Sequence, residues 1–318
     1  MSELILLDRF QWMARIRAFE QACLEGVRTR EIHGELHLAI GQEAIAAGMV
    51  GWMRDDDALV STHRNHSHAL VKGVSPYALL AEIFERSTGL CGGFGGHMHP
   101  FDVRHRFSAS GIVGASLPVA LGHAYSNRLS ESDAVAIAVT GEGGANHGTF
   151  HECMVMASAW KLPLMIVIEN NGFAISVKTQ EFATADVLAH RASAYGCAGA
   201  VVDGTDVDAV SRTFSALISQ TRSEMMPTVL VASCRRFQGH YEGDVQAYRP
   251  QEGDISAFDP LVRTRRDLMS TGVPVEDLDR IEKDAGVEMQ GLLARVRSDP
   301  LPNSVDALRN VFAEGGEG

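Results

Sequence analysis

The chain has 318 residues, of which 45% are hydrophobic and 21% are charged, and its formal net charge is −12. This composition is typical of a folded globular protein with a full core and excludes a disordered chain. The negative balance argues against a surface that binds nucleic acid or an anionic membrane.

The first ten residues, MSELILLDRF, contain two acidic side chains and only a short apolar stretch. They resemble neither a signal peptide nor an arginine-rich transit peptide. No apolar run approaches the roughly 18 residues that span a membrane. The five cysteines are scattered, odd in number and form no CxxC pair, which favours reduced thiols over a disulfide framework or a zinc site. We therefore expect a soluble, cytoplasmic protein.

Three helices and a long loop are predicted before residue 118. The first helix spans residues 4–30, where apolar side chains recur at helical spacing. Two more are predicted over Gln42–Met53 and Pro76–Arg86, since proline suits a first helical position. Residues 87–118 are rich in glycine and histidine and lack periodicity, as in a functional loop.

From residue 117 onward, helices and strands alternate. Helices are predicted at 117–128, 149–160, near 184–195 and at 207–222, and strands at 134–139, 164–168, 200–202 and 228–232. This alternation predicts the α/β class, with a doubly wound parallel sheet and helices on both faces. An apolar stripe predicts one more helix: Leu278, Ile281, Ala285, Met289, Leu292 and Val296. No domain boundary is evident, so we expect one domain over 1–318 with helical N- and C-terminal extensions.

Glu142 lies between two glycines directly after a predicted buried strand. Ligands of parallel sheets bind at the carboxyl ends of strands, where Asn170 and Asn171 also follow the next strand. Carboxylate and amide oxygens suit Mg²⁺, which binds substrate phosphates with its remaining positions. The following helix directs its positive end to the same place. Glu142 is therefore interpreted as holding a metal ion that in turn holds a diphosphate.

"GEG", 26 further residues and "NN" together resemble the thiamine-diphosphate motif. Seven more blocks, in the same order, resemble the alpha subunit of two-oxo-acid dehydrogenases, and "STHR" and "GHYEGD" are most similar to the acetoin dehydrogenase alpha subunit. The blocks are HLAIGQEA (37–44), STHRNHSHALVKG (61–73), GGHMHPFD (95–102), GIVGASLPVALG (111–122), TFHE (149–152), WKLP (160–163) and GHYEGDVQAYR (239–249). The resemblance implies the thiamine-diphosphate-binding fold and covers most of the chain.

The resemblance also implies roles for individual residues. Mg²⁺ would be bound by Glu142, the side chain of Asn171 and the backbone carbonyl of Phe173. The cofactor would be contacted by His63 and Arg64 at the diphosphate, by backbone amides of Gly143 and Gly144, and by backbone groups of Gly111 and Val113 at the aminopyrimidine. His240 matches an active-site histidine that orients or stabilises the thiamine adduct. His66 is a further catalytic candidate, with a loop hydrogen bond as the alternative.

In this family the glutamate that activates the aminopyrimidine lies on a separate beta subunit. The resemblance therefore implies a beta partner, in an alpha2-beta2 heterotetramer, and a lipoyl-bearing acyltransferase that accepts the acyl group. The expected activity is that of a thiamine-diphosphate-dependent oxidoreductase that cleaves acetoin or a 2-oxo acid. A lipoyl-independent decarboxylase or carboligase is the alternative.

The sequence departs from the family at three places. His63 stands where tyrosine is usual, Phe94 and His97 stand where lysine and serine are common, and the residues after His240 lack the serines phosphorylated in mitochondrial relatives. The phosphorylation is therefore not expected here.

The motifs also have alternative interpretations. Glu142 alone could cap the helix that follows it. His63, His66 and His68 have the composition of a zinc cluster. A nicotinamide-binding oxidoreductase is disfavoured because Asn146 occupies the position of the third glycine in the dinucleotide fingerprint. The last rival is a noncatalytic binding subunit.

Overall fold

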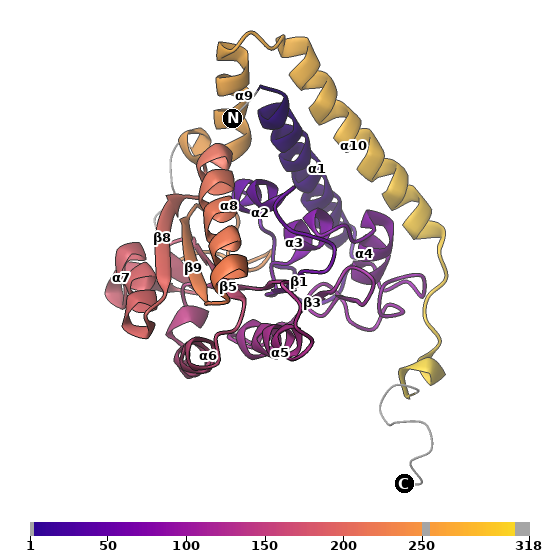
Figure 1. The fold of residues 1–318 in the computed structure, drawn as a ribbon. Helices are drawn as coiled ribbons and strands as arrows, with labels where there is room; N and C mark the ends of the chain where they lie inside the picture. The colour runs from indigo at the N-terminus through magenta and orange to yellow at the C-terminus, as the bar shows by residue number, and fades with distance from the viewer. Residues whose placement is uncertain (1–2, 250–254, 309–318) are drawn as a thin grey trace.

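The computed structural model describes residues 3–249 and 255–308 and centres on a seven-stranded sheet (Figure 1). The strand order is β2-β3-β1-β4-β5-β9-β8. All neighbours pair in parallel except β2 and β3, which are antiparallel. The strands are β1 Ala58–Ser61, β2 Phe101–Asp102, β3 Phe107–Ala109, β4 Ala136–Gly141, β5 Leu164–Asn170, β8 Ala198–Asp203 and β9 Thr228–Ser233. A separate small hairpin joins β6 Phe173–Ala174 to β7 Val177–Lys178.

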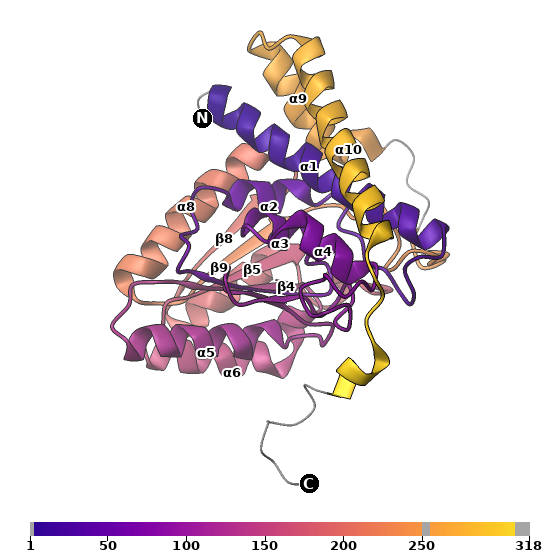
Figure 2. The ribbon, with the colours of Figure 1, turned by 90° about the vertical axis from the view of Figure 1, so that its right-hand side faces the viewer.

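Helices cover both faces of the sheet, as Figure 2 shows. They are α1 Glu3–Arg28, α2 Glu43–Met49, α3 His66–Val71, α4 Pro76–Ile83, α5 Ser116–Leu129, α6 Gly148–Ala159, α7 Ala185–His190, α8 Val207–Glu224, α9 Pro260–Ser270 and α10 Val275–Ser298. Strand residues alternate between two cores: Ile137 and Val139 join the core beneath α1, α2 and α8, whereas Ala136 and Ala138 join the core beneath α5 and α6. The predicted fold class is therefore confirmed.

Several short elements escaped the sequence-based prediction. Strand β1 has four residues and helix α3 has six, too few to show periodicity. Strands β2 and β3 lie inside the segment that was expected to be wholly loop, and β3 joins the sheet through β1. Helix α9 was also missed; its sequence, PLVRTRRDLMS, is short and has charged residues between its apolar ones.

Two predicted helices extend less far than expected because the backbone turns left-handed. The helix predicted over 42–53 ends at Met49, shortly before Gly51 with φ +81°. The helix predicted over 76–86 ends at Ile83, before Glu85 with φ +57°. Such φ values end a right-handed helix.

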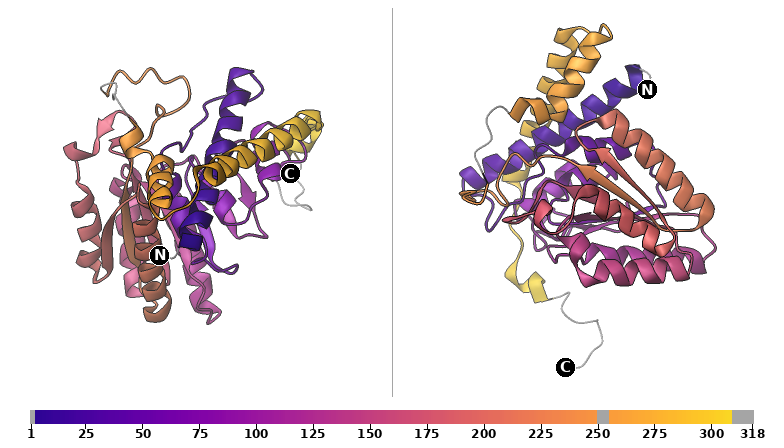
Figure 3. Two further views of the ribbon diagram at one scale, coloured as in Figure 1. Left: turned by 90° about the horizontal axis from the view of Figure 1, so that it is seen from above. Right: turned by 90° about the vertical axis from the view of Figure 1, so that its left-hand side faces the viewer.

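Helix α10 forms a long arm that runs along α1 and α4 (Figure 3). Its apolar stripe is buried at Leu278, Ala285, Met289, Leu293 and Val296, and Ile281 and Leu292 are partly buried against the same core. The predicted helix is therefore confirmed, and Leu293 is an additional member of its stripe. Among the helices within residues 3–249 and 255–308, none combines the length and apolarity needed to cross a bilayer.

Candidate active site

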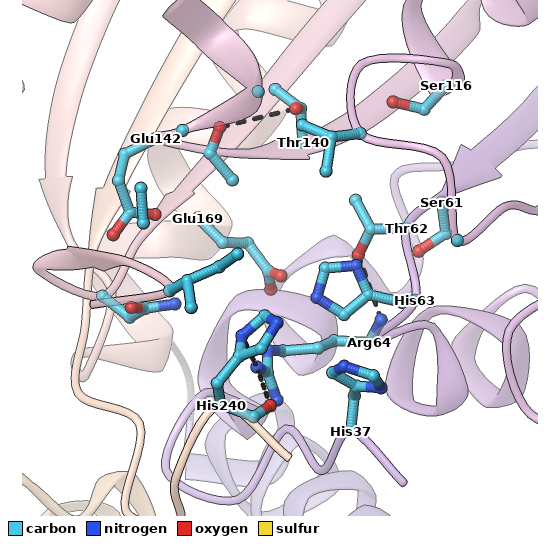
Figure 4. Close-up of a pocket in the computed structure, with 18 of the residues that line it drawn as sticks. His37, Ser61, Thr62, His63, Arg64, Ser116, Thr140, Glu142, Glu169 and His240 are labelled. Atoms are coloured by element: carbon cyan, nitrogen blue, oxygen red, sulfur yellow. Dashed lines mark hydrogen bonds between the residues drawn. The ribbon is translucent and has the colours of Figure 1, made fainter. Parts of the chain in front are cut away.

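A cavity of about 430 Å³ opens at the carboxyl ends of β1, β4 and β5. Charged and polar side chains and several glycines line it, among them Glu35, His37, Gln42, Ser61, His63, Arg64, Gly111, Val113, Glu142, Gly143, Gly144, Glu169, Asn171, Phe173, Arg236 and His240. In the view of Figure 4, Glu142 lies at one side of this space, and the carboxylate of Glu169 projects toward the middle, where the imidazoles of His63 and His240 are drawn. Ligands of parallel sheets bind at this edge.

Glu142 and Asn171 come together because their strands are neighbours. Strand β4 pairs in parallel with β5, with Gly141 opposite Glu169, so the residues that follow both strand ends share one edge. One end of the Asn171 amide lies 3.3 Å from Glu142 Oε1 and 3.1 Å from the carbonyl oxygen of Phe173. The expected adjacency of the two strand ends is confirmed.

The atom at that end of the Asn171 amide decides what the site can hold. A nitrogen there donates hydrogen bonds to both oxygens, whereas an oxygen there brings three oxygens together, which repel unless a cation lies between them. Adjacent ligands of Mg²⁺ are roughly 3 Å apart, given Mg–O distances of roughly 2.0–2.1 Å. This end of the Asn171 amide therefore lies at about the spacing of adjacent magnesium ligands from both Glu142 Oε1 and the Phe173 carbonyl oxygen.

Glu142 is buried beneath the cavity wall, with only 1% of its surface exposed. Burial raises the pKa of this carboxyl to about 7, against the opposing effect of nearby backbone N–H groups. Thr179 Oγ1 donates to Glu142 Oε1 at 3.3 Å. The alternative of a helix cap is wrong, because the side chain of His147 accepts from Thr149 N and caps α6.

Gly143 and Gly144 have no room for side chains. A Cβ on Gly144 would lie 2.2 Å from Thr140 Oγ1, and one on Gly143 would lie 2.8 Å from the Cβ of Ala174. Glycine is therefore required here by the protein's own packing, and it leaves the backbone at the cavity wall.

Arg64 and Arg236 bring positive charge to the cavity, although both are nearly buried. Arg64 donates to the carbonyl of Leu38 at 2.7 Å, and to the carbonyl and Nδ1 of His240. Burial, and then the charge of Arg236, lower the pKa of Arg64 to about 9. Two guanidinium groups that repel each other electrostatically are suited to bind a multiply charged anion between them.

His63 and His240 face the cavity together with His37. The ring centroids of His37 and His63 are 4.6 Å apart, and those of His63 and His240 are 5.5 Å apart. Burial, followed by the charge of Arg64, lowers the pKa of His63 to about 2 and that of His240 to about 4. These imidazoles are therefore neutral in the empty cavity.

His66 and His68 lie behind the cavity wall instead. His66 is fully buried, and its Nδ1 is 2.9 Å from Glu20 Oε2. His68 Nδ1 is 3.0 Å from the hydroxyl of Ser61. The structure thus gives His66 a buried hydrogen-bond partner and no place in the cavity lining. It also does not gather His63, His66 and His68 around one point.

Four cavity residues were not singled out from the sequence: His37, Gln42, Glu169 and Arg236. Glu169 is the next-to-last residue of β5, directly before Asn170, and this position near a strand end was the signal that could have found it. Its Oε1 is buried, accepts no hydrogen bond from the described residues and lies 3.4 Å from His68 Nε2. Arg236 likewise follows β9, whereas His37 and Gln42 reach the site only through the tertiary fold.

The loop that carries Gly111 and Val113 forms the rim of the cavity. Ile112 and Val113 are 69% and 54% exposed there, so two apolar side chains flank the opening. Exposed apolar groups beside a cavity are typical of a surface that another chain covers.

Comparison with known proteins finds a matching family and similar sequences over most of the chain. The family model described as "Dehydrogenase E1 component" matches residues 11–304. The alpha subunit of acetoin:2,6-dichlorophenolindophenol oxidoreductase from Cupriavidus necator is 35% identical, over 96% of this chain and 94% of that protein. The alpha subunit of the pyruvate dehydrogenase E1 component from Zymomonas mobilis is 32% identical, over 96% of this chain and 88% of its own length. The acetoin:2,6-dichlorophenolindophenol oxidoreductase alpha subunit of Bacillus subtilis is 31% identical, over 95% and 92% respectively.

Proposed function

The chain belongs to the dehydrogenase E1 component family, and we propose that it is the alpha subunit of a thiamine-diphosphate-dependent dehydrogenase. Its reaction is the cleavage of acetoin or a 2-oxo acid, with transfer of the acyl group to a lipoyl-bearing acyltransferase. The observation that carries the proposal is the convergence of oxygen ligands from Glu142, Asn171 and Phe173 at neighbouring strand ends.

These three residues would hold Mg²⁺, and the ion would neutralise the diphosphate. Arg64, with His63 beside it, would donate to the diphosphate oxygens, and the backbone of Gly143 and Gly144 would approach them closely. The guanidiniums of Arg64 and Arg236, together with a divalent ion, would offset the negative charge of a diphosphate. This donor set fits the cofactor.

When bound, thiamine diphosphate supplies the nucleophilic carbon and the electron sink for carbon–carbon cleavage. The chain's own residues then position the reacting groups. His240 faces the same cavity, and Arg64 donates to its Nδ1 at 3.2 Å. This bond places the proton of a neutral imidazole on Nε2, so His240 would present a hydrogen-bond donor to the substrate. Gly111 and Val113 would support the aminopyrimidine from the rim.

The glutamate that activates the aminopyrimidine would come from a beta subunit, in an alpha2-beta2 heterotetramer. The alpha subunits named among the relatives support this assembly. The exposed Ile112 and Val113 at the rim give such a partner an apolar surface to cover. We further propose that residues 1–318 act as one domain with helical extensions. A cytoplasmic location is supported by cysteines that are all free.

Titration of the purified alpha–beta pair with thiamine diphosphate tests the proposal. Saturable binding and substrate turnover are expected with Mg²⁺ and are lost with EDTA. Glu142→Ala should abolish cofactor retention, whereas Glu181→Ala, an exposed control on the segment after β7, should not. Turnover without any cofactor would contradict the proposal.

Product analysis separates the two possible fates of the acyl group. The dehydrogenase requires a lipoyl acceptor or an artificial oxidant. The lipoyl-independent alternative, a decarboxylase or carboligase, releases aldehyde or a coupled product from the pair alone.

A further inference from the structure

Three imidazoles from three separate segments gather at one wall of the cavity. His37 precedes α2, His63 follows β1 and His240 follows β9, and one nitrogen of each lies within 4.8 Å of the others. Their ring centroids are 4.6, 4.9 and 5.5 Å apart. We refer to His37, His63 and His240 as the histidine cluster (Figure 4).

We propose that the histidine cluster is a binding site for an imidazole-preferring transition-metal ion, with Zn²⁺ as the expected occupant. Three imidazole nitrogens with a fourth position open to water or substrate are one of the ligand sets of catalytic zinc sites. The nitrogens of such a site are roughly 3.3 Å apart, given Zn–N distances of roughly 2.0–2.1 Å. Side-chain movements of about an ångström would bring the cluster into this geometry.

The surroundings prepare two of the ligands for a metal. His37 Nδ1 is 3.0 Å from His97 Nε2, which orients the His37 ring from behind, as outer-shell partners of metal-bound histidines do. Burial lowers the pKa of His37 and His63 to about 2, so both imidazoles are in the neutral form that binds metal. Within the family that the chain resembles, tyrosine is usual at the position of His63 and serine is common at that of His97, so an imidazole at each of these two positions is a departure from the usual pattern.

Positive charge nearby limits the affinity of the site. Arg64 and Arg236 also line the cavity, and Arg64 donates to Nδ1 of His240. Metal binding through Nε2 moves the ring proton to Nδ1 and breaks this bond, while Arg64 keeps its bond to the carbonyl of Leu38. Glu35 Oε2, 4.0 Å from His37 Nε2, and Glu169 in the same lining partly offset the two cations.

This site differs in chemistry from the oxygen site at Glu142. Mg²⁺ prefers oxygen ligands and binds imidazole weakly, whereas Zn²⁺, Co²⁺ and Cu²⁺ bind imidazole well. A metal on the histidine cluster would also occupy the cavity assigned to the cofactor and substrate. Inhibition of turnover by Zn²⁺ is therefore expected, and this part alone rests on the proposed function.

Metal binding to the full chain tests the site without any activity measurement. Equilibrium dialysis with Zn²⁺ in excess Mg²⁺ should show one ion per chain. Co²⁺ should give the visible absorption of four-coordinate nitrogen ligation, without the charge-transfer band of a thiolate.

Substitutions identify the ligands. His63→Tyr and His240→Asn should each abolish stoichiometric Zn²⁺ binding, and His97→Ser should weaken it about 10- to 100-fold. His190→Gln, at an exposed histidine of α7 outside the cluster, should leave it unchanged. Near-ultraviolet circular dichroism of each variant shows whether the fold is retained.

Three outcomes would overturn the site: no Zn²⁺ bound, Zn²⁺ retained by folded His63→Tyr and His240→Asn, or a thiolate band with Co²⁺. A pair that binds Zn²⁺ on the cluster but lacks thiamine-dependent turnover would contradict the proposed function and leave this site intact. Active, thiamine-dependent enzyme without Zn²⁺ binding would do the reverse.

Discussion

In the proposed magnesium site, cation binding depends on the protonation state of Glu142. Its pKa is raised to about 7, chiefly by burial, so below this pH the empty site carries a proton that a metal must displace. Affinity for the ion should therefore fall by up to about tenfold per pH unit below about 7 and level off above it. Mn²⁺ titration by calorimetry, in buffers of different ionisation enthalpy, should show proton release near pH 6 and little near pH 8. Glu142→Gln is the control, and an unchanged affinity across this range would contradict the assignment.

The buried histidines predict a loss of stability in acid. The pKa values of His37 and His63 are lowered to about 2, that of His97 to about 3 and that of His240 to about 4. The unfolded chain takes up protons as the pH falls below about 6.5, but the folded chain does not until these lower values are reached. Their contribution to the free energy of unfolding is therefore complete above about pH 6.5 and is lost progressively below it.

Urea unfolding of wild type and His63→Tyr at several pH values measures one histidine's share. The variant should lose less stability between pH 6 and pH 4, by up to about 1.4 kcal/mol per pH unit. Glu142 acts in the opposite sense, but it is present in both proteins and cancels in the comparison. Identical slopes for the two proteins would show that His63 is protonated equally in the folded and unfolded states.

Among single residues, those that lie next to strand ends could be placed from the sequence. Glu142 and Asn171 could be placed together because consecutive strands joined by a right-handed crossover tend to be neighbours. The partners of His37 and His66 could not, because His97 and Glu20 are distant in sequence and only the tertiary fold brings them close. His66 is an example: its residue type suggested a catalytic role, whereas the structure places it behind the cavity wall.

Helices α2 and α8 pack so closely that Gly48 of α2 has no space for a side chain. A Cβ there would lie 2.5 Å from Val210 Cγ1 and 3.1 Å from the backbone nitrogen of Ser211. Gly48→Ala should lower the free energy of unfolding by about 1–3 kcal/mol through overpacking. Gly286→Ala in α10 meets nothing within 4 Å and should instead raise stability by about 0.5–1 kcal/mol. Chemical denaturation checks both, and equal effects would contradict the close packing at Gly48.

Helix α8 is also tied to the amino ends of the strands by a buried ion pair. Arg222 donates to both oxygens of Asp57 at 3.0 and 2.8 Å, and Asp57 is fully buried. Arg222→Ala leaves that carboxylate without its cation and should cost about 3–5 kcal/mol. Arg212→Ala, which breaks an exposed pair with Asp208 on the same helix, should cost at most about 0.5 kcal/mol. A cost for Arg222→Ala as small as that of the control would show that the pair adds little.

The elements that sequence predicted well are those with a long periodic pattern or a buried apolar run. Helices α1, α5 and α8 and strands β4, β5 and β9 were placed within a few residues. Strand β3 and helix α3 are short, and their sequences carry glycine-loop and histidine motifs rather than periodicity. They take their conformation from neighbours, β3 by pairing with β1.

For the molecule as a whole, the proposed assembly predicts that the alpha chain alone is not an enzyme. The alpha chain should bind thiamine diphosphate weakly and turn over no substrate, whereas addition of the beta subunit should restore both properties. Steady-state assays of each chain and of the mixture check this. Charged replacement of the rim, as in Val113→Asp, should weaken assembly in analytical ultracentrifugation, while Val245→Asp, at a highly exposed side chain elsewhere, should not. Turnover by the alpha chain alone would contradict the need for a beta-subunit glutamate. Glu169, a carboxylate in the cavity lining, would then be the candidate for activating the aminopyrimidine.

A crystal structure of the alpha–beta pair with thiamine diphosphate and Mn²⁺ in place of Mg²⁺, with anomalous scattering measured for Mn²⁺, would locate the ion. We expect one anomalous peak roughly 2.0–2.2 Å from a Glu142 oxygen, Asn171 Oδ1 and the carbonyl oxygen of Phe173, with diphosphate oxygens completing the coordination shell. A diphosphate bound without an ion between these residues, or an ion bound elsewhere in the cavity, would contradict the proposed magnesium site.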